Sequence, residues 1–192
     1  DDPELLSDEI VAKRAAQLCE VAENTAITKF GRSELVYIIG TEVPPPGGAT
    51  EEIDALEVTP ASRVKQTLAL HHHAFESKML LDAWQRVIGL VVQPGVEFDH
   101  TSIIEYEPKK AQPLSKYVLS VPNIVFEAHS TDYQKGSAYK SLVQDHFAIL
   151  KVGPQLTFAM REALFSLSHI EDELVYVENR SNLRDIFERE ML

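Results

Sequence analysis

Five polar residues stand directly after short apolar runs of the chain, at positions where their side chains could act on a substrate. They are Glu42, Gln93, His129, Asp132 and Lys151. A carboxylate can serve as a general acid or base, an imidazole can do the same or bind zinc, and a lysine suits an anion. In parallel α/β folds, the loops after the C-terminal ends of the strands form the active face. We therefore expect Glu42, His129 and Lys151 to converge on one pocket, with Gln93 and Asp132 nearby.

A phosphate site is predicted where Lys151 and Gly153 end one apolar run and precede a helical pattern. A cation beside the N-terminus of a helix favours a dianion, because the unpaired backbone N–H groups carry partial positive charge. Lys151 and Gly153 are therefore the candidate phosphate-binding residues. An ion pair of Lys151 with Glu127 or Glu42 at the same edge is the alternative, and the sequence leaves both open.

Other residues with reactive side chains have plainer explanations. Glu97 and Asp99 are carboxylates that could assist acid–base chemistry, but a solvated loop is the favoured interpretation of Glu97. The three histidines at 71–73 fall inside a helical pattern, where packing and exposure explain them better than a metal. Cys19 is the only cysteine, which excludes disulfides within the chain and a zinc site built from several cysteines. We expect Cys19 to be a buried, inert thiol.

The candidate residues follow four apolar runs that are typical of strands buried on both faces of a parallel sheet. These strands are predicted at 35–40, 86–92, 123–128 and 147–152. Helical periodicity occupies most of the intervening chain. It predicts helices over 7–24, 59–78, 112–119, 137–145, 155–174 and 183–191. A loop rich in proline and glycine runs from 41 to about 58.

This alternation predicts an α/β fold in which the four strands are parallel and adjacent in chain order. Strand sequences do not distinguish an open doubly wound sheet from a (β/α)8 barrel. A complete barrel needs roughly 250 residues, and the chain has 192. Four βα units would therefore form half of a barrel. In that case we expect one face of the sheet to be exposed.

The composition limits the function to a few classes. The chain carries a formal net charge of −12 and is 44% hydrophobic, as expected of one soluble α/β domain over residues 1–192. It has no cluster of lysine and arginine, so nucleic acid and anionic membranes are not expected as partners. No apolar run approaches the roughly 18 residues of a membrane span. The acidic N-terminus does not resemble a secretory signal, and we expect a cytoplasmic protein.

Five sequence motifs closely resemble those of one family, the accessory Z subunits of tagatose-1,6-bisphosphate aldolase in galactitol and N-acetylgalactosamine catabolism. These motifs are GTEVP at 40–44, QPGVEFDH at 93–100, EAHSTDYQ at 127–134, DHFAIL at 145–150 and KVGPQLTF at 151–158. The resemblance covers nearly the whole chain. It implies a TIM barrel of which this chain corresponds to the C-terminal half, strands five to eight.

The resemblance also implies a function. The family is regarded as non-catalytic, and it stabilises and activates a zinc-dependent class II aldolase subunit that would be the partner of this chain. His129 resembles a zinc ligand of class II aldolases, yet zinc is expected mainly on the partner subunit. A metal-dependent sugar-phosphate aldolase is the alternative function. The older family label, tagatose 6-phosphate kinase, is disfavoured because the chain lacks a Gly-x-x-x-x-Gly-Lys-Ser/Thr loop.

Two departures from class II aldolases point away from catalysis. Ser130, Thr131 and Asp132 stand where those enzymes have glycines, and Gly153-Pro154 stands where they have an asparagine. A phosphate loop needs residues that permit close backbone approach and positive φ, and proline removes an amide donor. We therefore expect a weakened phosphate site and negligible aldol cleavage by the protein alone.

Overall fold

The computed structural model describes residues 6–41 and 56–190. The chain divides into two units, Asp1–Lys151 and Val152–Leu192. Glu42 and most of the predicted proline-rich loop lie outside the described residues. Within the described residues, no helix combines the length and the apolar composition that a membrane span requires.

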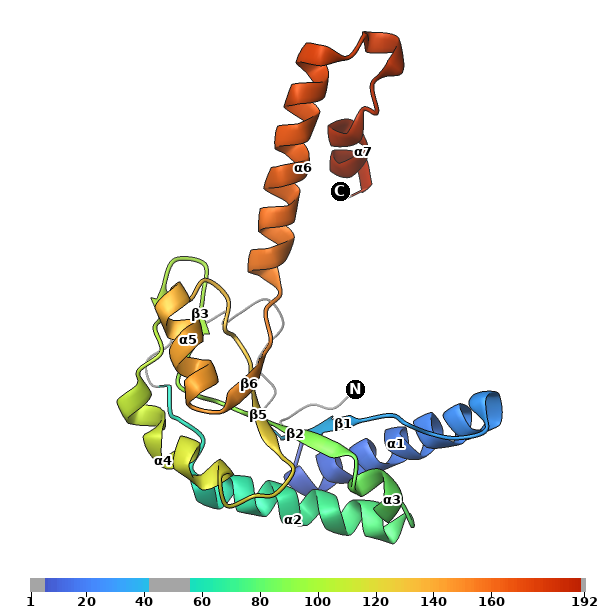
Figure 1. The fold of residues 1–192 in the computed structure, drawn as a ribbon, viewed down its shortest axis with the longest axis vertical. Coiled ribbons are helices and arrows are strands. Elements are labelled where there is room, and N and C mark those ends of the chain that lie inside the picture. Colours follow the sequence, from blue (N-terminus) through green and yellow to red (C-terminus); the bar gives the residue numbers. More distant parts are fainter. Residues whose placement is uncertain (1–5, 42–55, 191–192) are drawn as a thin grey trace. The chain divides into compact units, whose positions relative to one another are not determined.

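A four-stranded parallel sheet forms the centre of the first unit (Figure 1). Its strands are β1 (Tyr37–Ile39), β2 (Val87–Val92), β5 (Val125–Ala128) and β6 (Phe147–Leu150). They pair in the order β1-β2-β5-β6, and every pairing is parallel. The predicted α/β class and strand order are confirmed, although each strand is shorter than its apolar run. Among the described residues the sheet does not close into a barrel.

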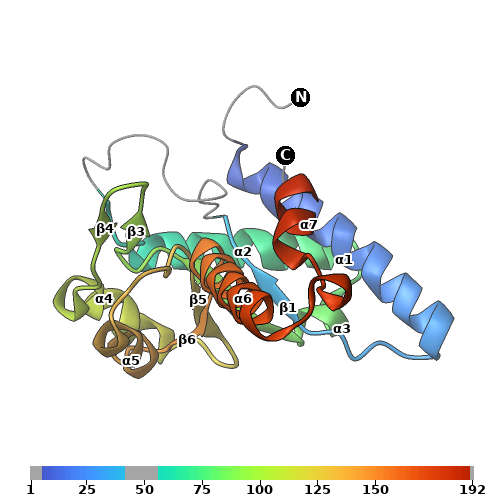
Figure 2. The ribbon, with the colours of Figure 1, turned by 90° about the horizontal axis from the view of Figure 1, so that it is seen from above.

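The helices of this unit follow the predicted alternation. They are α1 (Asp8–Phe30), α2 (Ala61–Ser77), α3 (Leu81–Trp84), α4 (Pro108–Val118) and α5 (Gly136–Gln144). The short helix α3 was not predicted, and α4 begins before its predicted start at residue 112. Figure 2 shows α1 and α2 side by side. The predicted end of α1 at residue 24 is too early, because no glycine or proline interrupts the chain before Gly31. Gly31 ends the helix with φ +77° and donates its N–H to the carbonyl of Ile27.

A short antiparallel hairpin was not predicted. Its strands are β3 (Glu97–Phe98) and β4 (Ile103–Ile104), and at its tip the Asp99 carboxylate accepts hydrogen bonds from Thr101 and Ser102. These bonds lower the pKa of Asp99 to about 2, and the bond from the Ser102 hydroxyl has the largest effect. Strands of two residues are too short to produce a hydrophobic period, so the pattern gave no signal for them.

The two faces of the sheet differ in what covers them. One face packs against the helices, and its buried side chains include Ile39, Leu90, Phe126 and Phe147. Gly89 marks the other face, where an added Cβ would lie 3.0 Å from Ile38 Cγ1 and 3.4 Å from Ile149 Cδ1. Ile38 is 43% exposed on that face. An apolar, partly open face is what the sequence predicts for half of a barrel.

The second unit is a helical hairpin of α6 (Pro154–Leu174), a 3₁₀ turn η1 (Val177–Asn179) and α7 (Leu183–Glu190). The Phe165 and Phe187 rings meet edge to face at 6.4 Å, and Arg161 and Arg184 lie over the Phe165 ring. An ion pair between Arg180 and Asp172 holds the turn. The helices predicted at 155–174 and 183–191 agree with α6 and α7, whereas η1 was not predicted.

Candidate functional site

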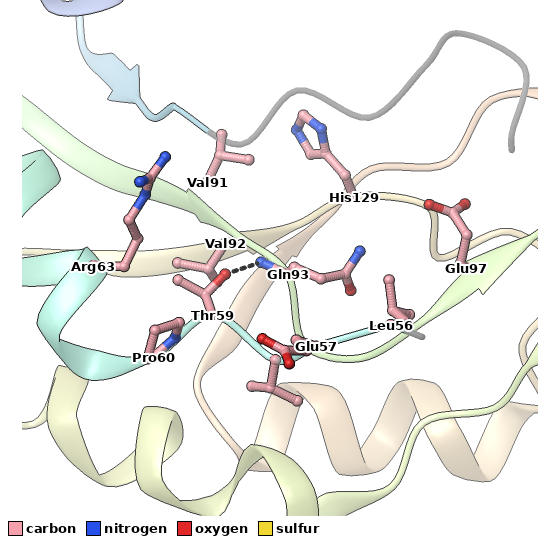
Figure 3. Close-up of a pocket in the computed structure, with 11 residues that line it drawn as sticks. Leu56, Glu57, Thr59, Pro60, Arg63, Val91, Val92, Gln93, Glu97 and His129 are labelled. Carbon is pink, nitrogen blue, oxygen red and sulfur yellow. Dashed lines mark hydrogen bonds between the residues drawn. The ribbon is translucent and has the colours of Figure 1, made fainter. Parts of the chain in front are cut away.

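A cleft of about 510 Å³ opens at the C-terminal end of β2. Gln93, Glu97 and His129 line it together with Glu57 and Arg63, as the close-up in Figure 3 shows. Gln93 follows the last residue of β2, and His129 follows that of β5. Parallel strands end at one edge of the sheet, so residues 36 positions apart in sequence become neighbours. Of the predicted pocket residues, the cleft therefore brings Gln93 and His129 together.

The His129 side chain is fixed by Glu127 on the same strand end. His129 Nε2 lies 2.6 Å from Glu127 Oε1, and the two side chains are 12% and 11% exposed. Alternate residues of a strand point to the same face, so Glu127 and His129 are placed to meet. His129 Nδ1 is buried and forms no hydrogen bond within the described residues. Nε2 is thus engaged, and Nδ1 is the nitrogen left for a ligand.

Gln93 holds the turn that follows β2. Its Oε1 accepts hydrogen bonds from the N–H groups of Gly95 and Val96, at 2.8 and 3.0 Å. Its backbone N–H donates to Thr59 Oγ1, and the Thr59 N–H donates to the Gln93 carbonyl. Gly95 takes φ +90°, a conformation that favours glycine. These bonds join the end of β2 to the segment that leads into α2, and they leave the amide nitrogen of Gln93 on the cleft side (Figure 3).

Glu97 is buried, so its prediction as a solvated loop residue is wrong. It is 6% exposed and lines the cleft, and its Oε1 accepts the N–H of Phe98. The reason is the β3–β4 hairpin, which packs onto the loop after β5. Phe98 meets the Tyr133 ring edge to face, and Gln134 bonds to the backbones of Ile104 and Tyr106. The sequence pattern predicted only a loop after residue 93, so it gave no indication that a hairpin packs there and buries Glu97.

Asp132 lies in the covered loop and does not line the cleft. It is 3% exposed. Burial first, and then the charge of Asp132, raise the pKa of Tyr139. The same loop is held by Thr131, whose hydroxyl donates to the Lys151 carbonyl over 2.8 Å. Ser130 takes φ +53° and Tyr133 φ +60°, so positive φ occurs in this loop although it has no glycine.

Lys151 and Gly153, the predicted phosphate residues, belong to different units. Lys151 continues the ladder of the sheet, because its N–H donates to the Ala128 carbonyl over 2.9 Å. Its side chain is exposed, does not line the cleft and forms no ion pair among the described residues. Glu127, the expected alternative partner, pairs with His129 instead. Gly153 precedes α6 with a negative φ, and an added Cβ would meet no atom within 4 Å.

Comparison with known proteins adds a family to this geometry. A family model described as D-tagatose-1,6-bisphosphate aldolase subunit GatZ/KbaZ-like matches residues 1–192. The chain belongs to this GatZ/KbaZ-like family. The resemblance stated from the sequence motifs is confirmed.

A crystal structure described as a probable tagatose 6 phosphate kinase from Sinorhizobium meliloti 1021 is similar to this GatZ/KbaZ-like chain. The two share 43% sequence identity with a TM-score of 0.71. The match covers 91% of this chain and 40% of that chain. The chain therefore spans less than half the length of that relative.

The described residues do not complete a metal site in this GatZ/KbaZ-like chain. His129 Nδ1 fits the role of one zinc ligand, because carboxylates commonly hold the other nitrogen of such histidines. No group of three His, Cys, Asp or Glu side chains among the described residues could hold a metal ion. Glu42, which was predicted for the same pocket, lies outside the described residues.

The remaining reactive residues lie in helices α1 and α2, where the sequence pattern placed them. His71 is fully buried on α2, and its Nδ1 lies 2.9 Å from the Thr67 carbonyl. His72 meets the Trp84 ring edge to face, and His73 is exposed. Cys19 is a free, buried thiol whose pKa is raised mainly by burial.

Proposed function

We propose that this GatZ/KbaZ-like chain supplies part of a non-catalytic subunit that stabilises and activates a class II D-tagatose-1,6-bisphosphate aldolase. The partner would be the catalytic aldolase subunit, with zinc bound there. The complex would cleave D-tagatose 1,6-bisphosphate to dihydroxyacetone phosphate and glyceraldehyde 3-phosphate. The family description supports an aldolase subunit. The accessory role and the galactitol or N-acetylgalactosamine pathway follow from the resemblance of the motifs, and a cytoplasmic location is proposed with them.

The proposal includes a fold: the four βα units form strands five to eight of a (β/α)8 barrel. Three features of the sheet support it. The strands are parallel and adjacent in chain order, the buried helix contacts lie on one face, and the opposite face is apolar around Gly89. In a barrel, that opposite face would become the packed interior.

One observation carries the accessory role. Several polar atoms at the C-terminal edge, including one oxygen each of Gln93 and Glu97, hold their own loops. Gln93 holds the turn at Gly95, Glu97 accepts its neighbour's N–H, and Thr131 binds the carbonyl of Lys151. A catalytic edge instead directs preorganised donors and acceptors at the reacting atoms.

A metal-dependent sugar-phosphate aldolase acting through His129, Glu42 and Lys151 is the second candidate. It is favoured by one observation, the buried Nδ1 of His129 with Glu127 fixing the opposite nitrogen. The described residues give only one such ligand, and they contain no group of three that could hold a metal ion. A tagatose 6-phosphate kinase is disfavoured by the missing phosphate-binding motif.

An aldolase assay with purified full-length protein separates these functions. We expect negligible cleavage of D-tagatose 1,6-bisphosphate by the protein alone. We expect higher activity, or a longer half-life on warming, when it is added to its class II partner. Robust cleavage by the isolated protein, abolished both by a chelator and by His129→Ala, would establish the metal-dependent enzyme instead. Binding of ATP would revive the kinase.

A further inference from the structure

We propose that the cleft beside Gln93 binds a neutral polyhydroxylated ligand, such as an open-chain sugar segment or a hexitol, and disfavours a phosphate group there. The inference goes beyond the accessory role and does not depend on it. It rests on the charges, the hydrogen-bonding groups and the apolar walls of the cleft.

Charge is the first argument. Glu57 and Glu97 line the cleft, and Glu127 stands behind His129. Among the lining residues that the structure describes, Arg63 is the only arginine or lysine, and its guanidinium already donates to Asp8 over 2.9 Å. Carboxylates therefore outnumber the cations, and like charges at short range disfavour a phosphate dianion.

Hydrogen-bonding capacity is the second argument. Within the described residues, the hydrogen bonds of Gln93 and Glu97 side chains use Oε1 alone. The Gln93 amide nitrogen can donate to a hydroxyl oxygen, and the second oxygen of Glu97 can accept a hydroxyl proton. A sugar hydroxyl both donates and accepts, so vicinal hydroxyls match this alternation. A metal cation would need several converging ligands, and the described residues supply no group of three.

Shape is the third argument. The cleft measures about 510 Å³, within the range of small-molecule pockets. Its apolar walls come from residues that flank the polar groups: Leu56, Val58, Pro60, Val91 and Val92. Such walls suit the C–H faces of a carbon chain whose hydroxyls point toward Gln93 and Glu97. Figure 3 shows Gln93 with Glu57, Glu97 and His129 around it.

Titration calorimetry on the full-length protein tests the inference with D-sorbitol, sorbitol 6-phosphate and inorganic phosphate. We expect saturable sorbitol binding and at least tenfold weaker binding of both phosphates. Calorimetry avoids the general stabilisation that polyols give in melting assays. Tighter binding of sorbitol 6-phosphate than of sorbitol would overturn the proposal, as would the lack of saturable sorbitol binding up to about 50 mM.

Charge-removing variants locate the site. Glu97→Gln keeps an oxygen for the Phe98 N–H but removes the negative charge of the buried carboxylate. Glu57→Gln removes the negative charge of an exposed carboxylate. We expect each to weaken sorbitol binding or leave it unchanged, and to shift the sorbitol to sorbitol 6-phosphate affinity ratio severalfold toward the phosphate. Glu105→Gln is the matched control, because Glu105 pairs with Lys135 on the surface, away from the lining residues. An equal shift in the control, or none in either cleft variant, would place binding elsewhere.

Discussion

His129 Nε2 and Glu127 Oε1 lie 2.6 Å apart at the end of β5, and both side chains are almost wholly buried. The bond fixes the ring in the cleft. Loss of one partner would leave the other buried and unsatisfied, which costs about 1–3 kcal/mol. The pair is therefore expected to contribute to stability as well as to the geometry of the cleft.

A double-mutant cycle measures this contribution. We expect Glu127→Ala and His129→Ala each to lower the free energy of unfolding by about 1–3 kcal/mol. The double variant should lose less than the sum of the two, since each single change already removes the bond. Urea unfolding gives the free energy of unfolding of the wild type, the two single variants and the double variant. Strict additivity would mean that the two side chains do not interact in solution.

The Glu23 carboxylate joins α1, β1 and the start of β2. It accepts hydrogen bonds from Ser33 at 2.7 Å and from Tyr37 and Arg86, both at 2.5 Å. Burial raises the pKa of Glu23, but these bonds outweigh it and the net direction is downward. Glu23→Gln should lower the free energy of unfolding by about 2 kcal/mol. Glu20→Gln is the control, because the Glu20–Lys78 pair is more exposed and should contribute less than about 1 kcal/mol.

The contribution of Glu23 should depend on pH. A carboxyl group whose pKa is lowered by folding stabilises the protein above its unfolded value of 4.5, and this contribution is lost as pH falls through the folded pKa. The difference in stability between wild type and Glu23→Gln should thus shrink below about pH 4.5. A constant difference down to pH 3 would contradict the role of the ionised carboxylate.

His71 should make the fold sensitive to mild acid. Burial lowers its pKa below 6.5, against a smaller opposite effect of its bond to the Thr67 carbonyl. The unfolded state then binds more protons, so stability contributed by neutral His71 is lost as pH falls below about 6.5. His71→Leu should flatten this dependence in denaturant melts between pH 7 and 5. The exposed His73→Ala is the control and should leave the slope unchanged.

Gly40 is predicted to be required by its close approach to β2. A Cβ there would lie 2.6 Å from Val91 Cβ, a contact that the backbone must shift to relieve. Gly40→Ala should therefore lower the free energy of unfolding by about 1–3 kcal/mol. Gly136 begins α5 with no atom within 4 Å of an added Cβ. Gly136→Ala should be neutral or stabilising by up to about 1 kcal/mol, as measured by urea unfolding.

The elements of the parallel sheet could be predicted because their signals are local. Apolar runs such as 86–92 and helical periodicity such as 155–174 depend on residues a few positions apart, and both appear in the structure within a few residues. The β3–β4 hairpin gave no such signal, since two residues per strand do not define a period. The contact of Glu127 with His129 was not predicted, because Glu127 lies inside an apolar run and the run does not indicate a bond to the imidazole two residues later.

The sequence by itself determined the α/β class, the strand order and the edge at which polar residues gather, because periodicity and the parallel crossover rule act along the chain. Only the tertiary structure decided which of these polar residues share a cleft. Gln93, Glu97 and His129 meet there because β2, the hairpin and β5 end side by side. Asp132 does not, because Ser130 and Tyr133 adopt positive φ and the hairpin covers their loop. Such turns depend on contacts between distant segments, which no local pattern encodes.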